Sequence, residues 1–148
     1  MGRSVNVVQR VGDGAHVTLA TSVTEELLRL WSAALVGVRK SRGGQALIDT
    51  LGTGDGDELL GGLVDLRALW LHVDGTVRGF LIVRAGVIAA VYVDPPARRL
   101  GIATSLVRTV LQSSLPPTDG YALPGDRATK SLYESLGWKA RLLTMRAD

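Results

Sequence analysis

Residues 91–104 place a strand, a tight turn and a helix start in succession, and together they could bind phosphate. They read Val-Tyr-Val-Asp-Pro-Pro-Ala-Arg-Arg-Leu-Gly-Ile-Ala-Thr. The first turn of a helix carries four N–H groups without intrahelical partners, and its dipole favours negative charge. Gly101 would let a ligand approach the backbone, and the small Ala103 keeps the same surface open. Arg98 and Arg99 can add charge-assisted hydrogen bonds, so the stretch predicts an anion site. The alternative is a turn that only caps a core helix, which one glycine would also suit.

Other reactive constellations are missing or weak. The sequence has no cysteine and two histidines, His16 and His72, so it offers no thiolate nucleophile and no all-histidine metal site. Residues 52–57, Gly-Thr-Gly-Asp-Gly-Asp, fit neither a dinucleotide fingerprint nor a P-loop, because the third glycine comes too early and no Lys-Ser/Thr follows. They do not match an EF-hand loop either. We expect no metal site, and we interpret residues 52–57 as a mobile loop beside a short helix.

The N-terminal elements that would support the turn follow from residue periodicity. A strand is expected over residues 15–21. An amphipathic helix follows, with Ser22 and Glu25 as a capping box and Gly43-Gly44 as its stop. The period of its apolar residues predicts that one face packs against the rest of the protein.

From residue 69 the apolar period changes to two, which predicts an antiparallel meander. Asp74-Gly75 suits a hairpin turn with positive φ at both central residues, and Ala85-Gly86 makes a second reversal. The last strand of the meander, residues 87–94, is apolar on both faces. Such a strand is expected to lie centrally in the sheet and to be the most buried of the three.

The C-terminal elements complete an α+β fold. A helix should run from residue 102, followed by a short strand over residues 121–123. Asp126 should cap a last helix that Gly137 stops, and a final strand should cover residues 140–145. We therefore expect a mixed, mostly antiparallel central sheet of six to seven strands, flanked by about four helices.

Composition sets the class of protein. The 148 residues fit one domain, residues 1–148, with 46% hydrophobic and 21% charged residues. The N-terminus leads into no signal-peptide h-region and no apolar run is long enough to span a bilayer, so we expect a cytoplasmic protein without a membrane partner. The formal net charge is +3, but the basic residues are scattered, which favours an ordinary solvated surface.

Two motifs in register resemble the GNAT superfamily of acetyl-CoA-dependent N-acetyltransferases. That superfamily has Gln/Arg-x-x-Gly-x-Gly/Ala after a strand ending in Val-x-Pro, and this chain has Arg98, Gly101 and Ala103 after residues 93–95. Residues 133–138, Tyr-Glu-Ser-Leu-Gly-Trp, resemble its Tyr-x-x-x-Gly-Phe/Trp motif. The resemblance covers about residues 69–145 and implies a GNAT-like fold that uses acetyl-CoA as co-substrate.

The resemblance implies roles for particular residues. Tyr133 would be the general acid that protonates the departing CoA thiolate; the alternative is a structural tyrosine bonded to a neighbouring backbone group. The turn would bind the pyrophosphate, and the strand before it would run beside the pantetheine arm. The cofactor-binding residues expected on this basis are Val91, Tyr92, Val93, Arg98, Arg99, Leu100, Gly101, Ile102, Ala103 and Thr104.

The chain departs from the family pattern at two places. Asp126 stands where relatives often have an asparagine that touches the cofactor, so Lys130 becomes the better candidate for a phosphate contact, or else a solvated lysine. Many relatives place a glutamate on the central strands as general base, but residues 66–94 contain none. His72, Tyr92 and Asp119 remain as alternatives, with His72 expected at the surface, and a backbone carbonyl with a water chain could also serve.

The expected acceptor is a primary amine of a small molecule or of a protein or peptide, and an aminoacyl-tRNA acceptor is left open. Two other functions compete with catalysis. One is a non-catalytic regulatory domain of the same fold that binds acyl-CoA. The other is a nucleic-acid-binding module, against which the leucine, alanine and tryptophan of residues 25–40 argue. A homodimer through an edge strand or the C-terminal strand is also left open.

Overall fold

The computed structural model describes residues 9–10, 16–52 and 55–147. Their six strands form one sheet in the order β1-β2-β3-β4-β5-β6. Its members are β1 (Gln9–Arg10), β2 (His16–Leu19), β3 (Leu69–Asp74), β4 (Thr76–Arg84), β5 (Val87–Val93) and β6 (Asp119–Gly120). Every neighbouring pair is antiparallel except β5 and β6, which are parallel. Residues 53–54 of the interpreted 52–57 loop lie outside the described part of the chain.

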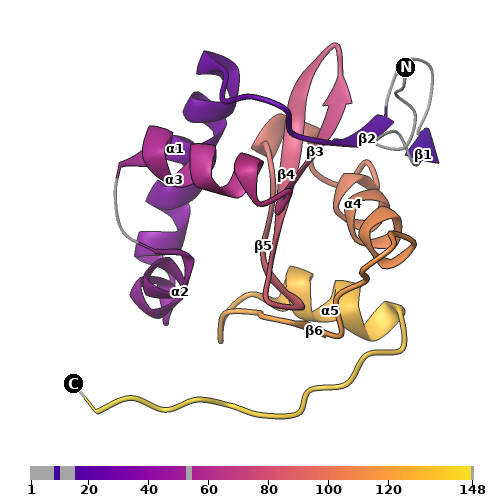
Figure 1. Cartoon of the computed structure of the whole chain (residues 1–148). Coiled ribbons are helices and arrows are strands. Elements are labelled where there is room, and N and C mark those ends of the chain that lie inside the picture. The colour runs from indigo at the N-terminus through magenta and orange to yellow at the C-terminus, as the bar shows by residue number, and fades with distance from the viewer. Residues whose placement is uncertain (1–8, 11–15, 53–54, 148) are drawn as a thin grey trace.

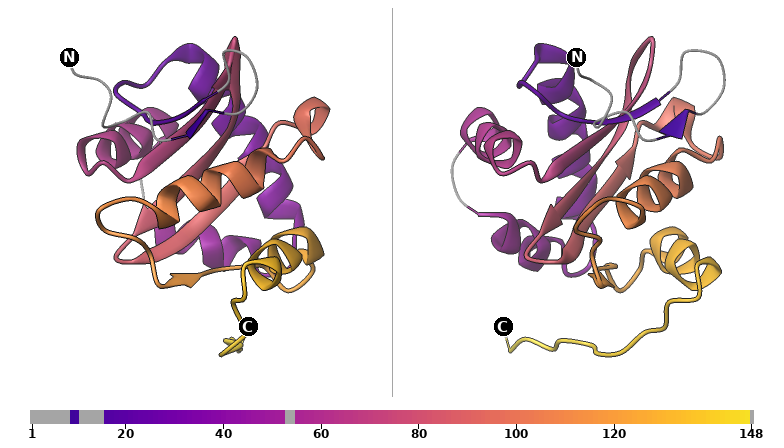
Figure 2. Two further views of the ribbon diagram at one scale, coloured as in Figure 1. Left: turned by 90° about the vertical axis from the view of Figure 1, so that its right-hand side faces the viewer. Right: turned by 45° about the vertical axis from the view of Figure 1, so that its right-hand side comes forward.

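Five α-helices cover the two faces of this sheet. They are α1 (Glu25–Lys40), α2 (Gly44–Leu51), α3 (Gly56–Asp65), α4 (Ile102–Leu111) and α5 (Arg127–Ser135). Figure 1 shows α1, α2 and α3 on one side of the strands and α4 on the other, with α5 beside β6. The views in Figure 2 show the same layers.

Each face of the sheet has its own core. Trp31 of α1, Leu60 of α3 and Phe80 of β4 are buried together on the face that α1 and α3 cover. Leu81 of β4 and Leu106 of α4 are buried on the opposite face. Because successive side chains of a strand point to opposite faces, β4 supplies both cores from adjacent residues.

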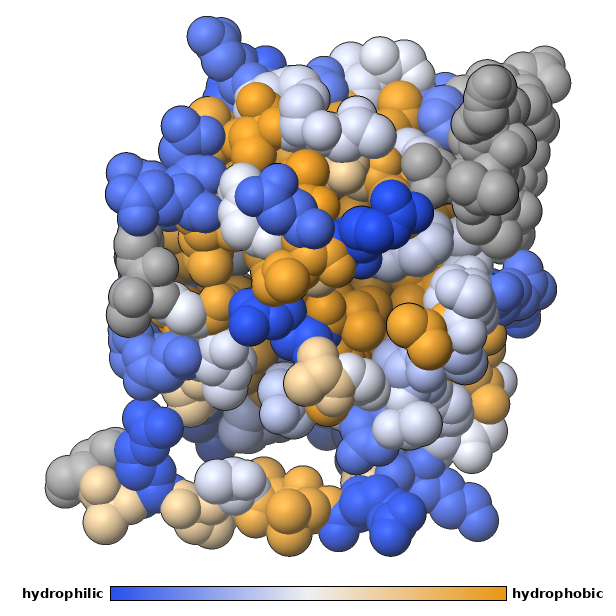
Figure 3. Space-filling model, viewed as in Figure 1, coloured by the Kyte–Doolittle hydropathy of each residue, from blue (hydrophilic) through white to orange (hydrophobic). Residues whose placement is uncertain are grey.

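The expected α+β architecture with a mostly antiparallel sheet is confirmed, with corrections to its elements. The described chain has five helices rather than about four, and β1 and β6 contain only two residues each. The predicted strand over residues 140–145 is wrong, since this segment pairs with no strand and its side chains are exposed. Figure 3 shows a row of residues apart from the body of the molecule at its lower side, where Figure 1 places the C-terminal segment.

Local expectations hold better than the placement of strands. The hairpin at residue 75 forms, although only Gly75 has a positive φ, of 73°. The reversal at Ala85-Gly86 also forms, with φ of 51° and 80°. The helix α1 is capped by Thr24 instead of Ser22, because the Thr24 side chain accepts a hydrogen bond from the Leu27 amide at 3.1 Å.

The strand β5 is neither central nor the most buried of the meander. Only two residues of β6 lie outside it, and most of its side chains are half-buried, whereas four of the six residues of β3 are buried. It is apolar on both faces because helices cover both: Ala89 packs in the α1 core and Ile88 in the α4 core. Burial of both faces of a strand therefore did not require a central position.

Candidate active site

The turn before α4 exposes a row of unused backbone donors. Arg99 and Gly101 both adopt the left-handed conformation, with φ of 69° and 81°. Gly101 is the N-cap and makes no side-chain cap, and the first bond of the helix joins the Ser105 amide to the Gly101 carbonyl at 3.0 Å. Within the described chain, no amide of residues 99–104 donates a hydrogen bond to another residue. Successive free amides around left-handed residues form an anion-binding concavity.

Arg98 fastens this turn to the end of β5. Its Nε donates to the Val93 carbonyl at 2.9 Å, and its guanidinium lies over the Tyr92 ring at 5.5 Å from the centroid. A guanidinium carries five N–H donors, so these contacts leave others directed to solvent. The arginine therefore acts first as a brace that holds the turn against the strand.

Beyond Ile88, the outer edge of β5 is open. The pairing of β5 with β6 covers only Val87 and Ile88, and the Tyr121 amide extends it by one bond to the Ile88 carbonyl at 2.9 Å. Residues 89–93 are paired with β4 on the other side but face no described strand on this one. The two strands thus diverge into a fork, with β5 as one arm and residues 121–123 as the other. An extended ligand could lie along the free edge.

Tyr133 lies where the fork begins. Its side chain is 7% exposed, and its hydroxyl donates to the Tyr121 carbonyl at 3.3 Å. Its ring stacks on Trp138 at 5.3 Å between centroids. Burial, with a smaller contribution from the charge of Asp126, raises the pKa of Tyr133 above its ordinary value. The phenol therefore remains protonated and aimed at the second arm of the fork.

Asp126 and Lys130 follow the sequence interpretation only in part. Asp126 caps α5 as expected: one carboxylate oxygen accepts from the Thr129 amide at 3.0 Å and the other from the Thr129 hydroxyl at 2.6 Å. Lys130 is exposed on α5, and nothing in its surroundings singles it out as a phosphate ligand.

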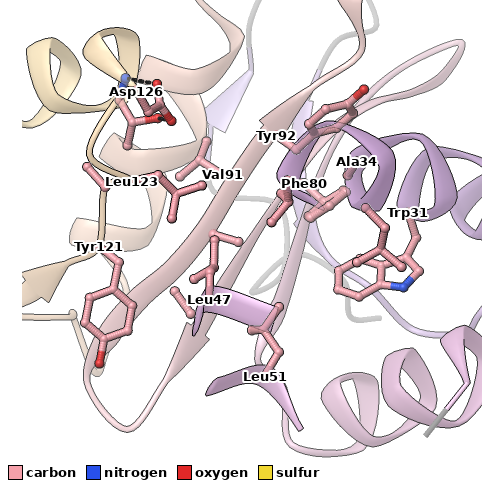
Figure 4. Close-up of a pocket in the computed structure, with 16 residues that line it drawn as sticks. Trp31, Ala34, Leu47, Leu51, Phe80, Val91, Tyr92, Tyr121, Leu123 and Asp126 are labelled. Carbon is pink, nitrogen blue, oxygen red and sulfur yellow. Dashed lines mark hydrogen bonds between the residues drawn. The ribbon is translucent and has the colours of Figure 1, made fainter. Parts of the chain in front are cut away.

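A cavity opens on the α1 face of the sheet and reaches the fork (Figure 4). Its volume is about 80 Å³, and it is open to solvent at one side. Three groups of residues line it: the inner faces of α1 and α2, the strands β4 and β5, and the segment from Tyr121 to Thr129. The lining residues are Trp31, Ala34, Leu35, Val38, Leu47, Leu51, Phe80, Ala89, Ala90, Val91, Tyr92, Tyr121, Ala122, Leu123, Asp126 and Thr129. Sequence reasoning missed this cavity, because its walls come from segments far apart in the chain.

The candidate bases are separated by the fold. His72 was expected at the surface, which is wrong: it is 2% exposed, and neither ring nitrogen has a hydrogen-bond partner among the described residues. Its strand neighbour Leu71 packs in the α1 core, so His72 points to the α4 face, away from the cavity. Asp119 is exposed on β6, at the closed end of the fork. Of the three alternatives, only Tyr92 lines the cavity.

Two further features of the described residues bear on the chemistry. No group of three histidine, cysteine, aspartate or glutamate side chains among them could hold a metal ion. Across the same residues, every helix is too short or too polar to cross a membrane.

Comparisons with known proteins identify the family of the chain. The model of the Acetyltransferase (GNAT) family matches residues 44–138. No curated protein matches the chain. Among solved structures, a GNAT family acetyltransferase from Streptococcus pneumoniae TIGR4 is similar with 18% identity and a TM-score of 0.58, over 90% of this chain and 99% of that one.

The names of two other similar structures refer to an amine substrate or to an analog of one. A ribosomal-protein-alanine N-acetyltransferase from Brucella melitensis biovar Abortus 2308 is 21% identical, with a TM-score of 0.55 over 91% of this chain and 99% of that one. AAC(6')-Iy, in complex with the bisubstrate analog CoA-S-monomethyl-acetylneamine, is 16% identical, with a TM-score of 0.50 over 90% and 98%. At these identities the likeness shows the fold, while the family match covers most of the chain. The protein belongs to the GNAT family of acetyltransferases.

Proposed function

We propose that this protein transfers an acetyl group from acetyl-CoA to a primary amine, with both substrates bound together. The observation that carries the proposal is the run of free amides at residues 99–104, which adjoins the open edge of β5. The amides suit a pyrophosphate, and the edge suits an extended pantetheine arm with amide groups of its own. Val91, Tyr92 and Val93 would lie beside that arm.

In this proposal the fork determines where the reaction occurs. The amine nitrogen bonds to the thioester carbon, the carbon–sulfur bond breaks, and the sulfur needs a proton. Tyr133 would supply it, because its hydroxyl lies at the fork and its raised pKa keeps it protonated. The phenolate would then regain a proton from solvent, which takes the one that the amine loses.

The names of two similar structures are consistent with an amine acceptor. One acts on a ribosomal-protein alanine, and the other is bound to an analog that joins CoA to acetylneamine. These names concern those proteins. They support the reaction class for this chain but not a particular acceptor.

The test is acetyl-CoA binding by calorimetry to the native protein and to Gly101→Glu. The substitution places a carboxylate among the free amides, where no atom lies within 4 Å of the site of a Cβ. A side chain at φ of 81° also costs about 1 kcal/mol. Gly86→Glu is the matched control, since Gly86 has φ of 80°, equally open space and a place at the opposite end of β5.

We expect micromolar binding to the native protein and to Gly86→Glu, and a loss of at least about 100-fold for Gly101→Glu, because several charge-assisted contacts disappear together. Equal binding by all three proteins would mean that the pyrophosphate lies elsewhere. If none binds, the proposed function is wrong.

A second candidate is a regulatory domain that binds acyl-CoA without turnover. One observation favours it: the only carboxylate among the described residues of the cavity is Asp126, and both its oxygens already accept hydrogen bonds. Release of free CoA thiol in the presence of an amine distinguishes the two, because only a transferase produces it.

A further inference from the structure

We infer that the cavity on the α1 face receives the body of the acceptor, and that the acceptor is an apolar monoamine. The inference rests on the proposed function and adds the substrate class. The cavity meets the fork on the face opposite α4, since Val91 of one arm and Leu123 of the other both line it. Figure 4 shows Val91 and Leu123 near each other, on the side of β5 away from Trp31.

The walls of the cavity are suited to a hydrocarbon chain or ring. Its floor is aromatic: the ring centroids of Trp31 and Phe80 are 5.6 Å apart, and those of Phe80 and Tyr92 are 5.7 Å apart. Leu47 and Leu51 of α2 close the far side (Figure 4). Burial of apolar surface here would provide about 25 cal/mol for each Å² removed from water.

The charges of the lining exclude other kinds of amine. Among the described lining residues there is no lysine, arginine or histidine, so a carboxylate on the acceptor finds no counter-ion. Asp126 is the one negative charge, and Thr129 occupies both of its oxygens. A second ammonium on the acceptor would have to compete with this helix cap for Asp126 as its counter-ion, which is unfavourable.

The apolar lining also reduces the need for a general base such as Tyr92. Desolvation favours the neutral form of an amine over the ammonium. An acceptor would thus enter after losing its proton to water, and no residue of the chain needs to remove it. The pH dependence of the reaction should then follow the pKa of the acceptor itself.

Three six-carbon amines with different distal ends test the inference. They are hexylamine, 1,6-diaminohexane and 6-aminohexanoate. Binding of each to the protein saturated with CoA is measured by calorimetry, and turnover with acetyl-CoA is measured by CoA thiol release. We expect kcat/KM for hexylamine to exceed that of the other two by about 100-fold. For diaminohexane the largest possible ratio is about 1,000-fold, because its second amine can enter in the neutral form. An amine of pKa ~10.4 is neutral in about one molecule in 1,000 near pH 7.4.

A variant of the cavity wall can supply a negative charge for the second ammonium of diaminohexane. Leu47→Glu adds a carboxylate to the wall, and it should raise kcat/KM for diaminohexane relative to hexylamine by at least about 10-fold. Val36→Glu is its control, because Val36 is 53% exposed on α1 and does not line the cavity.

A less basic acceptor tests the pH dependence. With 2,2-difluorohexylamine in place of hexylamine, the rise of kcat/KM with pH should occur at a lower pH, by the difference between the two amine pKa values.

The outcomes separate the inference from the proposed function. Hexylamine that binds selectively without any turnover would support the inference and contradict the proposed function. Equal binding and turnover of all three amines would overturn the inference while the proposed function stands. Acetylation confined to peptide N-termini would overturn it as well, as would a pH profile that is the same for both hexylamines.

Discussion

The substitution Gly120→Ala tests whether the position of the Tyr133 hydroxyl matters. A Cβ at residue 120 would lie 2.6 Å from Cζ of Tyr133 and 2.8 Å from its hydroxyl oxygen. Carbon atoms in contact are about 3.5–4.0 Å apart, so the ring must retreat by about 1 Å. The ring cannot rotate away freely, since it stacks on Trp138 and is buried. The methyl group therefore displaces the proposed proton donor without removing it.

The expected effects are separable by assay. Overpacking should lower the free energy of unfolding by about 1–3 kcal/mol, measured by denaturant titration. A misplacement of about 1 Å should reduce kcat by about 100-fold, measured by CoA thiol release, with acetyl-CoA affinity unchanged. Gly125→Ala is the control, because a Cβ there meets no atom within 4 Å.

A double-mutant cycle shows whether the two residues act together. Tyr133→Phe alone should reduce kcat by about 100- to 10,000-fold, the usual contribution of a general acid. Adding Gly120→Ala to Tyr133→Phe should then change kcat little, because the hydroxyl that it displaces is gone. If Gly120→Ala retains full kcat, or if the two effects simply multiply, Tyr133 is structural and the mechanism proposed above is wrong.

Two other predictions concern stability. The pKa of His72 is lowered by burial and, to a lesser degree, by His16 and Arg78, against an opposing effect of Asp74, so the unfolded state binds the proton more tightly. Stability should therefore fall as pH drops below about 6.5, by up to about 1.4 kcal/mol for each pH unit, and His72→Leu should lose this dependence in denaturant titrations from pH 7 to pH 5; an unchanged slope would implicate another group. Ala85 has φ of 51° before Gly86 at 80°, a type I′ turn in which asparagine is favoured, so Ala85→Asn should raise the unfolding temperature by about 2–4 °C in a thermal melt, and a lower one would contradict this reading of the turn.

The site was predictable where its chemistry is local in the sequence. The turn at residues 98–104 needs a glycine with positive φ before a helix, and Gly101 has it. Asp126 caps α5 because its side chain reaches the amide three residues later. Both features depend on backbone geometry within a few residues, which residue type largely decides.

The features that could not be predicted from the sequence depend on tertiary contacts. His72 alternates with leucine and valine in a way that suits a strand with one wet face, but α4 covers that face and buries it. The apolar run of β5 indicated burial on two faces and not which edges would be paired. The cavity needs Trp31, Leu51 and Tyr121 to converge from three separate elements, and no spacing along the chain encodes that meeting.

Because β5 and β6 pair over so short a length, the segment that follows β6 is held to the sheet by few backbone hydrogen bonds. Only two paired positions join the sheet to the segment that begins at residue 119, so few backbone hydrogen bonds need to break for that segment to swing outward. A ligand that contacted both arms of the fork would join them as the missing strand–strand hydrogen bonds would. Ligand binding would then slow amide hydrogen exchange in residues 119–123 and along the open edge of β5. The slowing should be far larger there than in β3 and β4, which are paired with a strand on both sides. The fork that makes room for a substrate thus also converts binding into local rigidity.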